Sequence, residues 1–439
     1  MNDVPSGWLA PLRARLAPRR AMMLAFFASG MNQVFGSFTN LLLNVYLVRH
    51  MLPHDFGLYN IAFAITISVG AIANGVFLLP MTVDMPHDDP RARDRFMLDV
   101  IGSVVVTAVH LGAIAIAIAT CGQALELVGI DAVAFVSATA LSCAAYLFKE
   151  CMTQAGFNQG RERVAVWINV ASAAATGTFV TAAVLFNLHL EASHAISIYA
   201  VGQAVGMIVG YRLIFRGVAP PSPARAWSGT GHLLRRGLWS AASSLLAILR
   251  TQAHTIVVTV LLGPVGVAQI NAARLMFAPI PMIQPALVRA AMPRLVKQLR
   301  RDVSAFRKSA LLLTLGLGAM SAIFGAALLT IGPWAFRYVV SGDYNYSAAL
   351  FGAWALVFTL AAVRGGLELE LQALARFVVL TRIGLITMIT TLVAVLALTY
   401  MLGAAGALFG LAIGELVTCF LLFRTAQGEP ATSTVQSGL

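Results

Sequence analysis

Residues 98–120 read LDVIGSVVVTAVHLGAIAIAIAT, and Asp99 and His110 carry the only ionisable side chains among them. A helix of about 20 apolar residues crosses a hydrocarbon core about 30 Å thick. In lipid, only helices and closed barrels satisfy every backbone hydrogen bond, and this stretch lacks the polar–apolar alternation of a barrel strand. The stretch is therefore predicted to be a transmembrane helix.

The rest of the chain repeats this pattern. Hydrophobic residues make up 59% of the chain and charged residues only 11%, with a mean hydropathy of +0.81. Soluble domains carry about 25% charged residues. Similar stretches lie at 21–48, 56–80, 131–149, 164–186, 194–215, 237–262, 267–292, 308–331, 347–366, 377–401 and 406–423. We expect an all-α integral membrane protein with about twelve transmembrane helices.

The basic residues are distributed unevenly between the two sides of this arrangement. If the N-terminus is cytoplasmic, 25 of the 30 Lys and Arg residues fall on the cytoplasmic side, Lys149 among them. Only Arg49 and Arg337 fall on the other side, and three arginines lie within spans. Cytoplasmic loops accumulate basic residues, so both termini are predicted to be cytoplasmic. The same rule explains the net charge of +12, so we expect no nucleic-acid partner.

The chain is predicted to contain two halves of six spans. The expected segments are a basic interfacial segment at 1–20, bundles at 21–215 and 237–424, a cytoplasmic linker at 216–236 and a tail at 425–439. A shift of 211 residues superposes MLPHDFGLYNIAF at 51–63 on LLGPVGVAQINAA at 261–273, and matches Pro53 with Pro264, Asn60 with Asn271 and Ala62 with Ala273. Six spans return the chain to the same side, so the halves are expected to form a parallel repeat.

The sequence around this repeat resembles a known family. VRHMLPHDFGLYNIAFAI at 48–65 and TIVVTVLLGPVGVAQINAARLMFAPIPMIQPALVRAAMPRL at 255–295 are similar to the polysaccharide-transport branch of the multidrug/oligosaccharidyl-lipid/polysaccharide (MOP) exporter superfamily, which contains the Wzx-type O-antigen flippases. The family pattern Leu-Gly-Pro, small residue, Gly, Tyr, Ala is matched by Leu52, Pro53, Phe56, Gly57 and Tyr59, and by Leu262, Gly263, Pro264, Gly266 and Ala272. Gln269 departs from it, because an aromatic residue is usual there.

The resemblance implies two six-helix bundles around a central cavity that opens to each side in turn. It implies a cargo, a polyprenyl-diphosphate-linked oligosaccharide, moved from the cytoplasmic to the periplasmic leaflet of a bacterial inner membrane. The translocated oligosaccharide would then be used in the synthesis of surface polysaccharide, such as O-antigen or exopolysaccharide. Membrane lipids, a polysaccharide polymerase and glycosyltransferases would then be its partners.

Three side chains at membrane depth are candidates for contact with such a cargo. Arg250 lies near the middle of its span, His254 follows four residues later on the same face, and Arg274 lies about two turns into the next span. Charged groups at this depth normally face a cavity or a partner. A guanidinium binds phosphate bidentately, which suits a diphosphate. The alternative is that Arg250 or Arg274 pairs with an internal carboxylate such as Glu415.

The first span carries a polar stripe formed by Gln33, Ser37, Asn40 and Asn44. Amides and hydroxyls can bind the hydroxyl groups of sugars, but they also hold membrane helices together. The first reading makes Gln33, Asn40 and Asn44 candidates for the cavity wall.

Glu415, in the last span, is the carboxylate expected nearest to mid-membrane. It either exchanges H⁺ or Na⁺ during coupling or pairs with an arginine. Glu368 and Glu370 are expected to form a solvated ion-pair cluster with Arg364 and Arg376.

Enzymatic signals are absent from the sequence, which contains no Walker A, HExxH or CxxC pattern. We therefore predict a transporter with no cofactor or metal. One rival is a cation or drug antiporter of the same superfamily, in which cavity carboxylates would be expected. The other is a membrane glycosyltransferase or polymerase, which usually carries a large external loop; the longest here, 332–346, has about 15 residues.

Overall fold

The computed structural model describes residues 40–427, apart from 87–88, 128, 217–222, 300, 341–342 and 375. All regular elements in these residues are helical. Gln33, Ser37 and the predicted interfacial segment at 1–20 lie outside the described residues.

The first half contains a helix at 40–50 followed by seven helical elements. These are α2 (Pro53–Ala73), the π-helix η1 (Asn74–Leu78), α3 (Leu79–Val83), α4 (Pro90–Ala124), α5 (Ile130–Asn158), α6 (Glu162–Leu185) and α7 (Ala192–Ile214). Pro53 begins α2, where its fixed φ and missing N–H cost nothing. The elements α2, η1 and α3 run on as one span.

The second half contains α8 (Pro223–Leu275), α9 (Pro279–Leu299), α10 (Val303–Val339), α11 (Ala348–Ala373) and α12 (Phe377–Gln427). Both α8 and α12 double back at a glycine, Gly263 with φ 70° and Gly403 with φ 64°. This left-handed conformation favours glycine, which has no Cβ.

The described residues contain nine helices long and apolar enough to cross a membrane. Because Gly403 divides α12 into two spans, and because the end of α8 and α9 together match the predicted span at 267–292, eleven of the twelve predicted spans correspond to helices. Of the first predicted span, 21–48, only the part from residue 40 is described, and it is helical. The protein is a multi-pass, all-α membrane protein, which confirms the predicted fold class.

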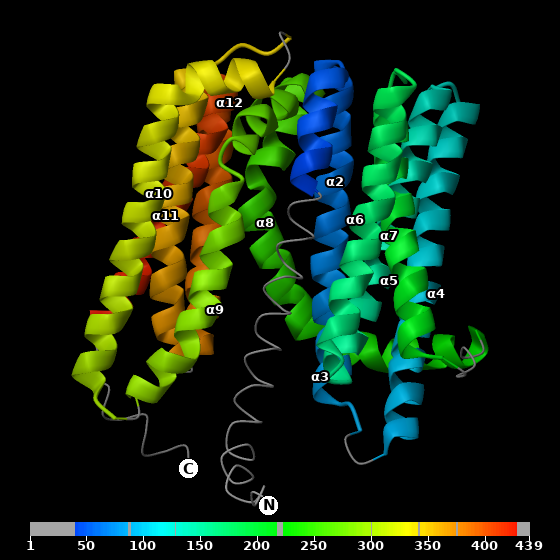
Figure 1. Ribbon diagram of the computed structural model, residues 1–439, viewed down its shortest axis with the longest axis horizontal. Coiled ribbons are helices and arrows are strands. Elements are labelled where there is room, and N and C mark those ends of the chain that lie inside the picture. Colours follow the sequence, from blue (N-terminus) through cyan, green and yellow to red (C-terminus); the bar gives the residue numbers. More distant parts are fainter. Residues whose placement is uncertain are drawn as a thin grey trace, which may run out of the picture.

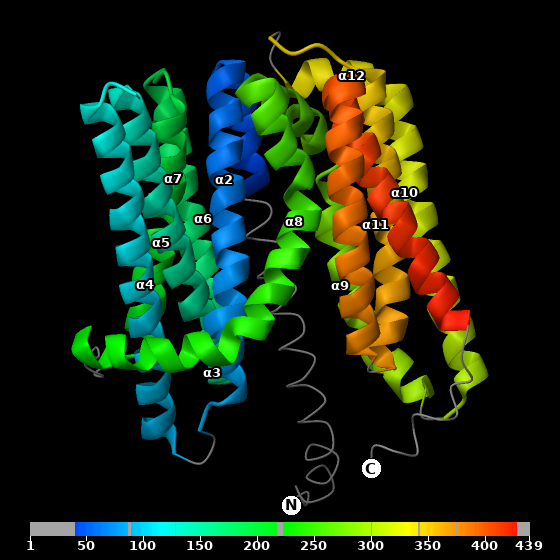
Figure 2. The same ribbon diagram turned by 180° about the vertical axis from the view of Figure 1, so that it is seen from behind.

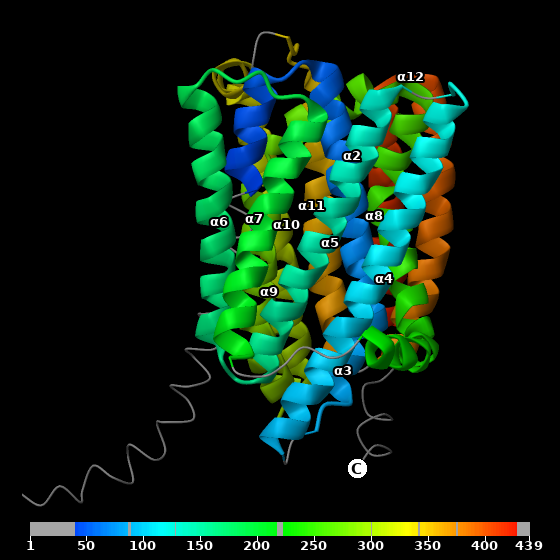
Figure 3. The same cartoon turned by 90° about the vertical axis from the view of Figure 1, so that its right-hand side faces the viewer.

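The helices form two bundles side by side (Figures 1 and 2). The helices of the first half are grouped on one side and α9–α12 on the other (Figure 1). Figure 3 looks from the side of the first half, so that its helices lie in front of those of the second bundle. The membrane part of α8 lies between them and contacts both α2 and α12. Figure 2 shows the first part of α8 lying across α4 before the chain turns into the bundle. Much of the predicted linker at 216–236 is therefore helix, from Pro223 onward.

The sequence repeat has a structural counterpart. Asn60 Nδ2 donates to the carbonyl of Phe56 at 2.7 Å, and Asn271 Nδ2 donates to the carbonyl of Val267 at 3.0 Å. Donors and acceptors are both related by the 211-residue shift found in the sequence. The two segments therefore carry the same local structure, as a repeat requires.

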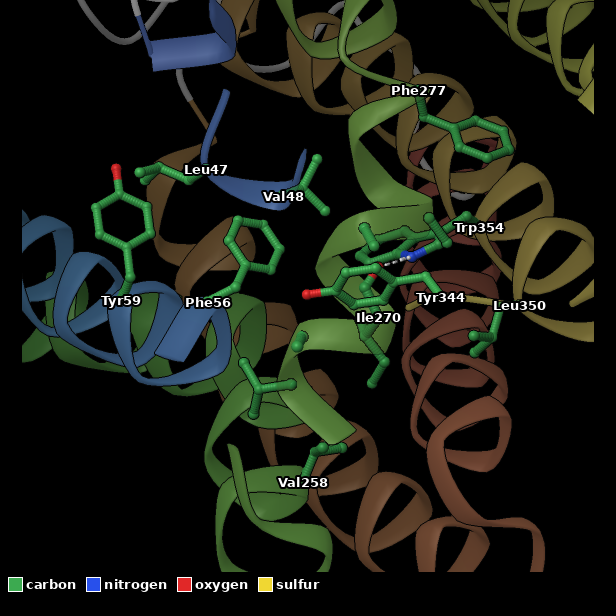
Figure 4. Packing of buried hydrophobic residues seen from close by; sticks show 14 of the residues in the cluster. Leu47, Val48, Phe56, Tyr59, Val258, Ile270, Phe277, Tyr344, Leu350 and Trp354 are labelled. Atoms are coloured by element: carbon green, nitrogen blue, oxygen red, sulfur yellow. Dashed lines mark hydrogen bonds between the residues drawn. The ribbon is translucent and has the colours of Figure 1, made fainter. Parts of the chain in front are cut away.

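The two halves meet closely at one end of the molecule, which we call the closed end. Gly57 lies against Pro264 so tightly that a Cβ at residue 57 would overlap the Pro264 carbonyl oxygen. Arg49 donates a hydrogen bond of 2.6 Å to the carbonyl of Tyr338 across the interface. Figure 4 shows Phe56 and Tyr344 directed toward one another from opposite halves, with their ring centroids 6.3 Å apart. Toward the other end, which we call the open end, the bundles diverge (Figures 1 and 2).

Two helices are longer than the sequence predicted. α5 does not end at residue 149 but continues to Asn158. Lys149, counted in the sequence with the cytoplasmic residues, therefore lies inside the helix, buried, where Nζ contacts Glu150 at 2.6 Å and Asn169 at 3.1 Å. The connection predicted at 332–346 is also shorter than expected, because α10 runs to Val339. The sequence pattern underestimated both helices because their last turns are not uniformly apolar.

Candidate functional site

A cavity of about 310 Å³ lies between the halves, beside the closed end. Its wall is formed by the helix at 40–50, α2, α8, α9 and α11. The polar residues of the wall are Asn40, Asn44, Asn60, Gln252, Thr255, Asn271 and Arg274. One cation, five amides and one hydroxyl thus face a single space, and the described residues of its wall contribute no carboxylate.

Arg274 is the charged residue of this cavity. It lies in the last turn of α8, just before the break at residues 276–278, and its guanidinium sits 5.8 Å from the centroid of the Trp354 ring. Trp354 is held in place because its indole N–H donates to the carbonyl of Ile270 at 3.0 Å, drawn as the dashed line in Figure 4. Among the described residues, no carboxylate lies within 4 Å of Arg274. The guanidinium is therefore oriented by an aromatic face, and the described part of the chain supplies no counter-ion for it.

The amides of the wall come from both halves. Asn60 and Asn271 bond to the carbonyl four residues earlier in their helices, and Asn44 Nδ2 likewise bonds to the Asn40 carbonyl at 2.8 Å. Local bonds of this kind satisfy an amide donor within its own helix. The amide oxygens of Asn60 and Asn271 keep their capacity to accept hydrogen bonds, which suits a ligand rich in hydroxyl groups.

Arg250 has a different environment. Its guanidinium lies 3.9 Å from Glu368, and Glu368 in turn lies 2.8 Å from Arg364. Arg364 contacts Glu415 at 2.5 Å. The four side chains form an alternating chain of charges across α8, α11 and α12, which we call the ion-pair chain. Its two guanidiniums and two carboxylates balance one another.

The ion-pair chain differs from the cluster expected from the sequence. The side chains of Arg364 and Glu415 are only 17% and 7% exposed, so this part of the cluster is not solvated. The alternative of a paired Glu415 corresponds to the observed geometry, but its partner is Arg364, two spans earlier, and Arg250 pairs with Glu368 instead.

His254 is buried beside the cavity. It is 3% exposed, and its ring meets Trp354 edge-on with the centroids 5.6 Å apart. Its Nδ1 has no hydrogen-bond partner among the described residues. The histidine therefore supports Trp354, on which Arg274 lies, and does not line the cavity.

The structure brings together only part of the predicted set. Asn40, Asn44 and Arg274 line the cavity, whereas Arg250, His254 and Glu415 lie outside its wall. Sequence reasoning missed Trp354 and did not select Asn60. The signal for Asn60 was present, because it is one of the three residues matched by the repeat.

A second cavity of about 300 Å³ lies near the closed end. Its wall includes Pro53 from the first half and Gln269, Asp343 and Tyr346 from the second. The described residues contain no group of three or more His, Cys, Asp or Glu side chains placed to hold a metal ion.

Comparisons with known proteins identify the fold. No protein-family model matches the chain, and no curated protein does. A structure of the lipid II flippase MurJ, in an inward closed conformation, matches this chain with a TM-score of 0.68 and 10% identity. The match covers 93% of this chain and 88% of the MurJ chain.

Transporters of the MATE family also match over nearly the whole chain. A eukaryotic MATE transporter covers 94% of this chain and 96% of its own, with a TM-score of 0.62 and 17% identity. An inward-facing multidrug resistance MATE family transporter of the MOP superfamily matches 93% of this chain and 96% of its own chain, with a TM-score of 0.65 and 16% identity. The chain therefore has the fold of MOP-superfamily transporters.

Proposed function

We propose that this chain is a secondary transporter that flips a polyprenyl-diphosphate-linked oligosaccharide across a bacterial inner membrane. The observation that carries the proposal is Arg274, a guanidinium in the central cavity with no carboxylate beside it among the described residues. A cation held at this depth without a partner is costly unless a ligand supplies the counter-charge. A diphosphate supplies it in the geometry that a guanidinium binds best.

The rest of the cavity wall suits the sugar part of such a cargo. Asn40, Asn44, Asn60 and Asn271 offer amide groups, and Thr255 offers a hydroxyl. Hydroxyl-rich ligands need several donors and acceptors, because each polar group that binding buries unpaired lowers the affinity. The fold likeness to a lipid II flippase agrees with a lipid-linked cargo of this type.

A cation or drug antiporter is the second candidate, because MATE transporters share the fold. Against it stands the charge of the cavity, since Arg274 would repel a cationic drug and no described residue of the wall is acidic. Like charges at close range in a low dielectric cost several kcal/mol.

Coupling to H⁺ or Na⁺ is assigned in this proposal to Glu415. Its carboxylate is 7% exposed and its charge is held by Arg364 at 2.5 Å. A proton or a sodium ion would have to compete with that guanidinium, so coupling requires Arg364 to move during the cycle. If Glu415→Gln responds to imposed H⁺ and Na⁺ gradients as the wild type does, the residue has no coupling role.

The proposed setting follows from the distribution of basic residues. Arg91, Arg93, Arg161 and Arg216 lie at the open end, which is assigned to the cytoplasm, and the closed end faces the periplasm. The structure then corresponds to a state that receives cargo from the inside. A polysaccharide polymerase and glycosyltransferases are the proposed partners.

The test is flipping in reconstituted vesicles, with a fluorescent polyprenyl-diphosphate trisaccharide as the probe. We expect transport by the wild type and by Arg337→Ala, which removes an exposed arginine that does not belong to the cavity wall, and little transport by Arg274→Ala. Ethidium uptake is measured in the same vesicles. Transport of ethidium but not of the lipid-linked sugar would replace this proposal with the antiporter.

A further inference from the structure

A separate groove of about 600 Å³ lies on the first bundle, away from the central cavity. Its wall comes from α4, α5 and α7 and is almost entirely apolar. Representative residues are Ile101, Val105, Phe148, Met207 and Ile208. The proposed transport cycle uses none of these side chains, so the groove is unexplained by the function proposed above.

The groove has the length of one membrane leaflet. Along α4 its wall extends from Leu98 to His110, a separation of 12 residues. At the helical rise this is about 18 Å, against about 15 Å for half of the hydrocarbon core. Leu98 lies two turns into α4 from its open end, where the charged residues of the first turns give way to the apolar stretch 98–120. The groove therefore runs from about that membrane surface to about the bilayer centre.

A cation lies at the surface end of this apolar groove. Arg212, in the last turn of α7, belongs to its wall and is exposed. Among the described residues no carboxylate lies within 4 Å of its guanidinium. Unlike Arg274, it is placed at the interface, where lipid phosphates lie and where a guanidinium and a phosphate form charge-assisted hydrogen bonds.

From this arrangement we propose that the groove binds an anionic phospholipid of the open-end leaflet, with one acyl chain along α4 and the phosphate at Arg212. Gly102, which has no side chain, is one of the buried residues of the groove wall. A polyprenyl tail is a poorer occupant, because it is branched and longer than a groove that ends near the bilayer centre.

The bound lipid would stabilise the joint between the two halves. The floor of the groove, formed by Leu98, Ile101 and Met152, belongs to one apolar cluster with Phe215, which ends α7. Ala241, in the part of α8 that enters the bundle, packs against the same cluster. Filling the groove therefore supports the packing on both sides of the connection from α7 to α8.

The test uses native mass spectrometry of the full chain in detergent, with phosphatidylglycerol and phosphatidylcholine as the probes. We expect the wild type to retain one phosphatidylglycerol with at least tenfold preference over phosphatidylcholine. Arg212→Gln should lose that preference, and Arg161→Gln, which removes another exposed arginine at the open end, should keep it. Added phosphatidylglycerol should raise the melting temperature of the wild type more than that of Arg212→Gln.

Two further variants make the test independent of the arginine. Gly102→Leu should fill the groove and abolish retention of either lipid; if it fails to fold, Val105→Phe at the exposed rim serves instead. Retention that is unchanged in Arg212→Gln and in the groove-filling variant would overturn the proposal. Displacement of phosphatidylglycerol by polyprenyl phosphate would also overturn it, since the groove would then belong to the cargo. Neither result depends on flipping, so the site and the proposed function can fail separately.

Discussion

Arg274 and Arg250 lie on the same element, α8, yet they are in opposite electrostatic situations. Arg274 faces the central cavity and rests on the ring of Trp354, without a described carboxylate nearby. Arg250 begins a chain of alternating charges that passes through Glu368 and Arg364 to Glu415. The first guanidinium is available to an anionic ligand, and the second is already neutralised within the protein. Depth in the membrane alone therefore does not identify a binding residue.

The largest expected effect comes from breaking the ion pair between Arg364 and Glu415. Arg364→Leu leaves Glu415 buried without its partner and should destabilise the protein by about 3–5 kcal/mol. The double variant Arg364→Leu/Glu415→Leu should regain most of that loss, because no lone charge remains. Thermal unfolding in detergent measures both, with Arg382→Leu, at an exposed arginine, as the control. Equal loss in the single and double variants would mean that the two charges are not coupled.

The next largest effect is expected for Arg274, which has no ion-pair partner among the described residues. Arg274→Ala should leave the melting temperature within error of the wild type, because no described carboxylate loses a partner. Binding of a diphosphate-linked sugar should weaken by more than tenfold, corresponding to about 1.5–3 kcal/mol for hydrogen bonds to a charged group. Isothermal titration in nanodiscs provides the measurement. A marked loss of stability with unchanged binding would reverse the assignment.

A smaller effect is expected for Arg250, whose contact with Glu368 is long at 3.9 Å. Arg250→Gln should cost about 1 kcal/mol or less, because Glu368 keeps Arg364 as its nearer partner. Binding of the lipid-linked sugar should change less than twofold. If instead Arg250→Gln weakens binding as much as Arg274→Ala, the ion-pair chain opens to receive cargo and the contrast between the two arginines disappears.

The smallest effect tests the symmetry of the cavity. Asn60→Ala and Asn271→Ala each remove an amide whose donor bonds within its own helix, so each should weaken cargo binding by about twofold to threefold. Because the two residues occupy equivalent places in the repeat, the losses should be similar. An effect confined to Asn271 would place the ligand against α8 alone, beside Arg274.

The sequence was sufficient to predict the repeat and the spans that fall in the described part of the chain, because both rest on local patterns. Apolar length determines whether a helix crosses, and Pro53 and Pro264 mark equivalent helix starts. It was not sufficient to distinguish Arg250 from Arg274, because the partners that decide the matter come from α11 and α12, more than 90 residues further along the chain. Burial of Lys149 was missed for the same reason, since Asn169 on α6 supplies its partner.

The contact between Gly57 and Pro264 also limits how this chain can change over time. The two residues belong to opposite copies of one duplicated segment, and no side chain fits between them at the closed end. Residues in direct contact do not respond independently to substitution. A mutation that adds bulk at residue 57 is tolerated only if the backbone around residue 264 shifts as well. Two copies of a duplicated segment ordinarily accumulate substitutions independently. At the point where these two copies touch, a substitution in one depends on a change in the other.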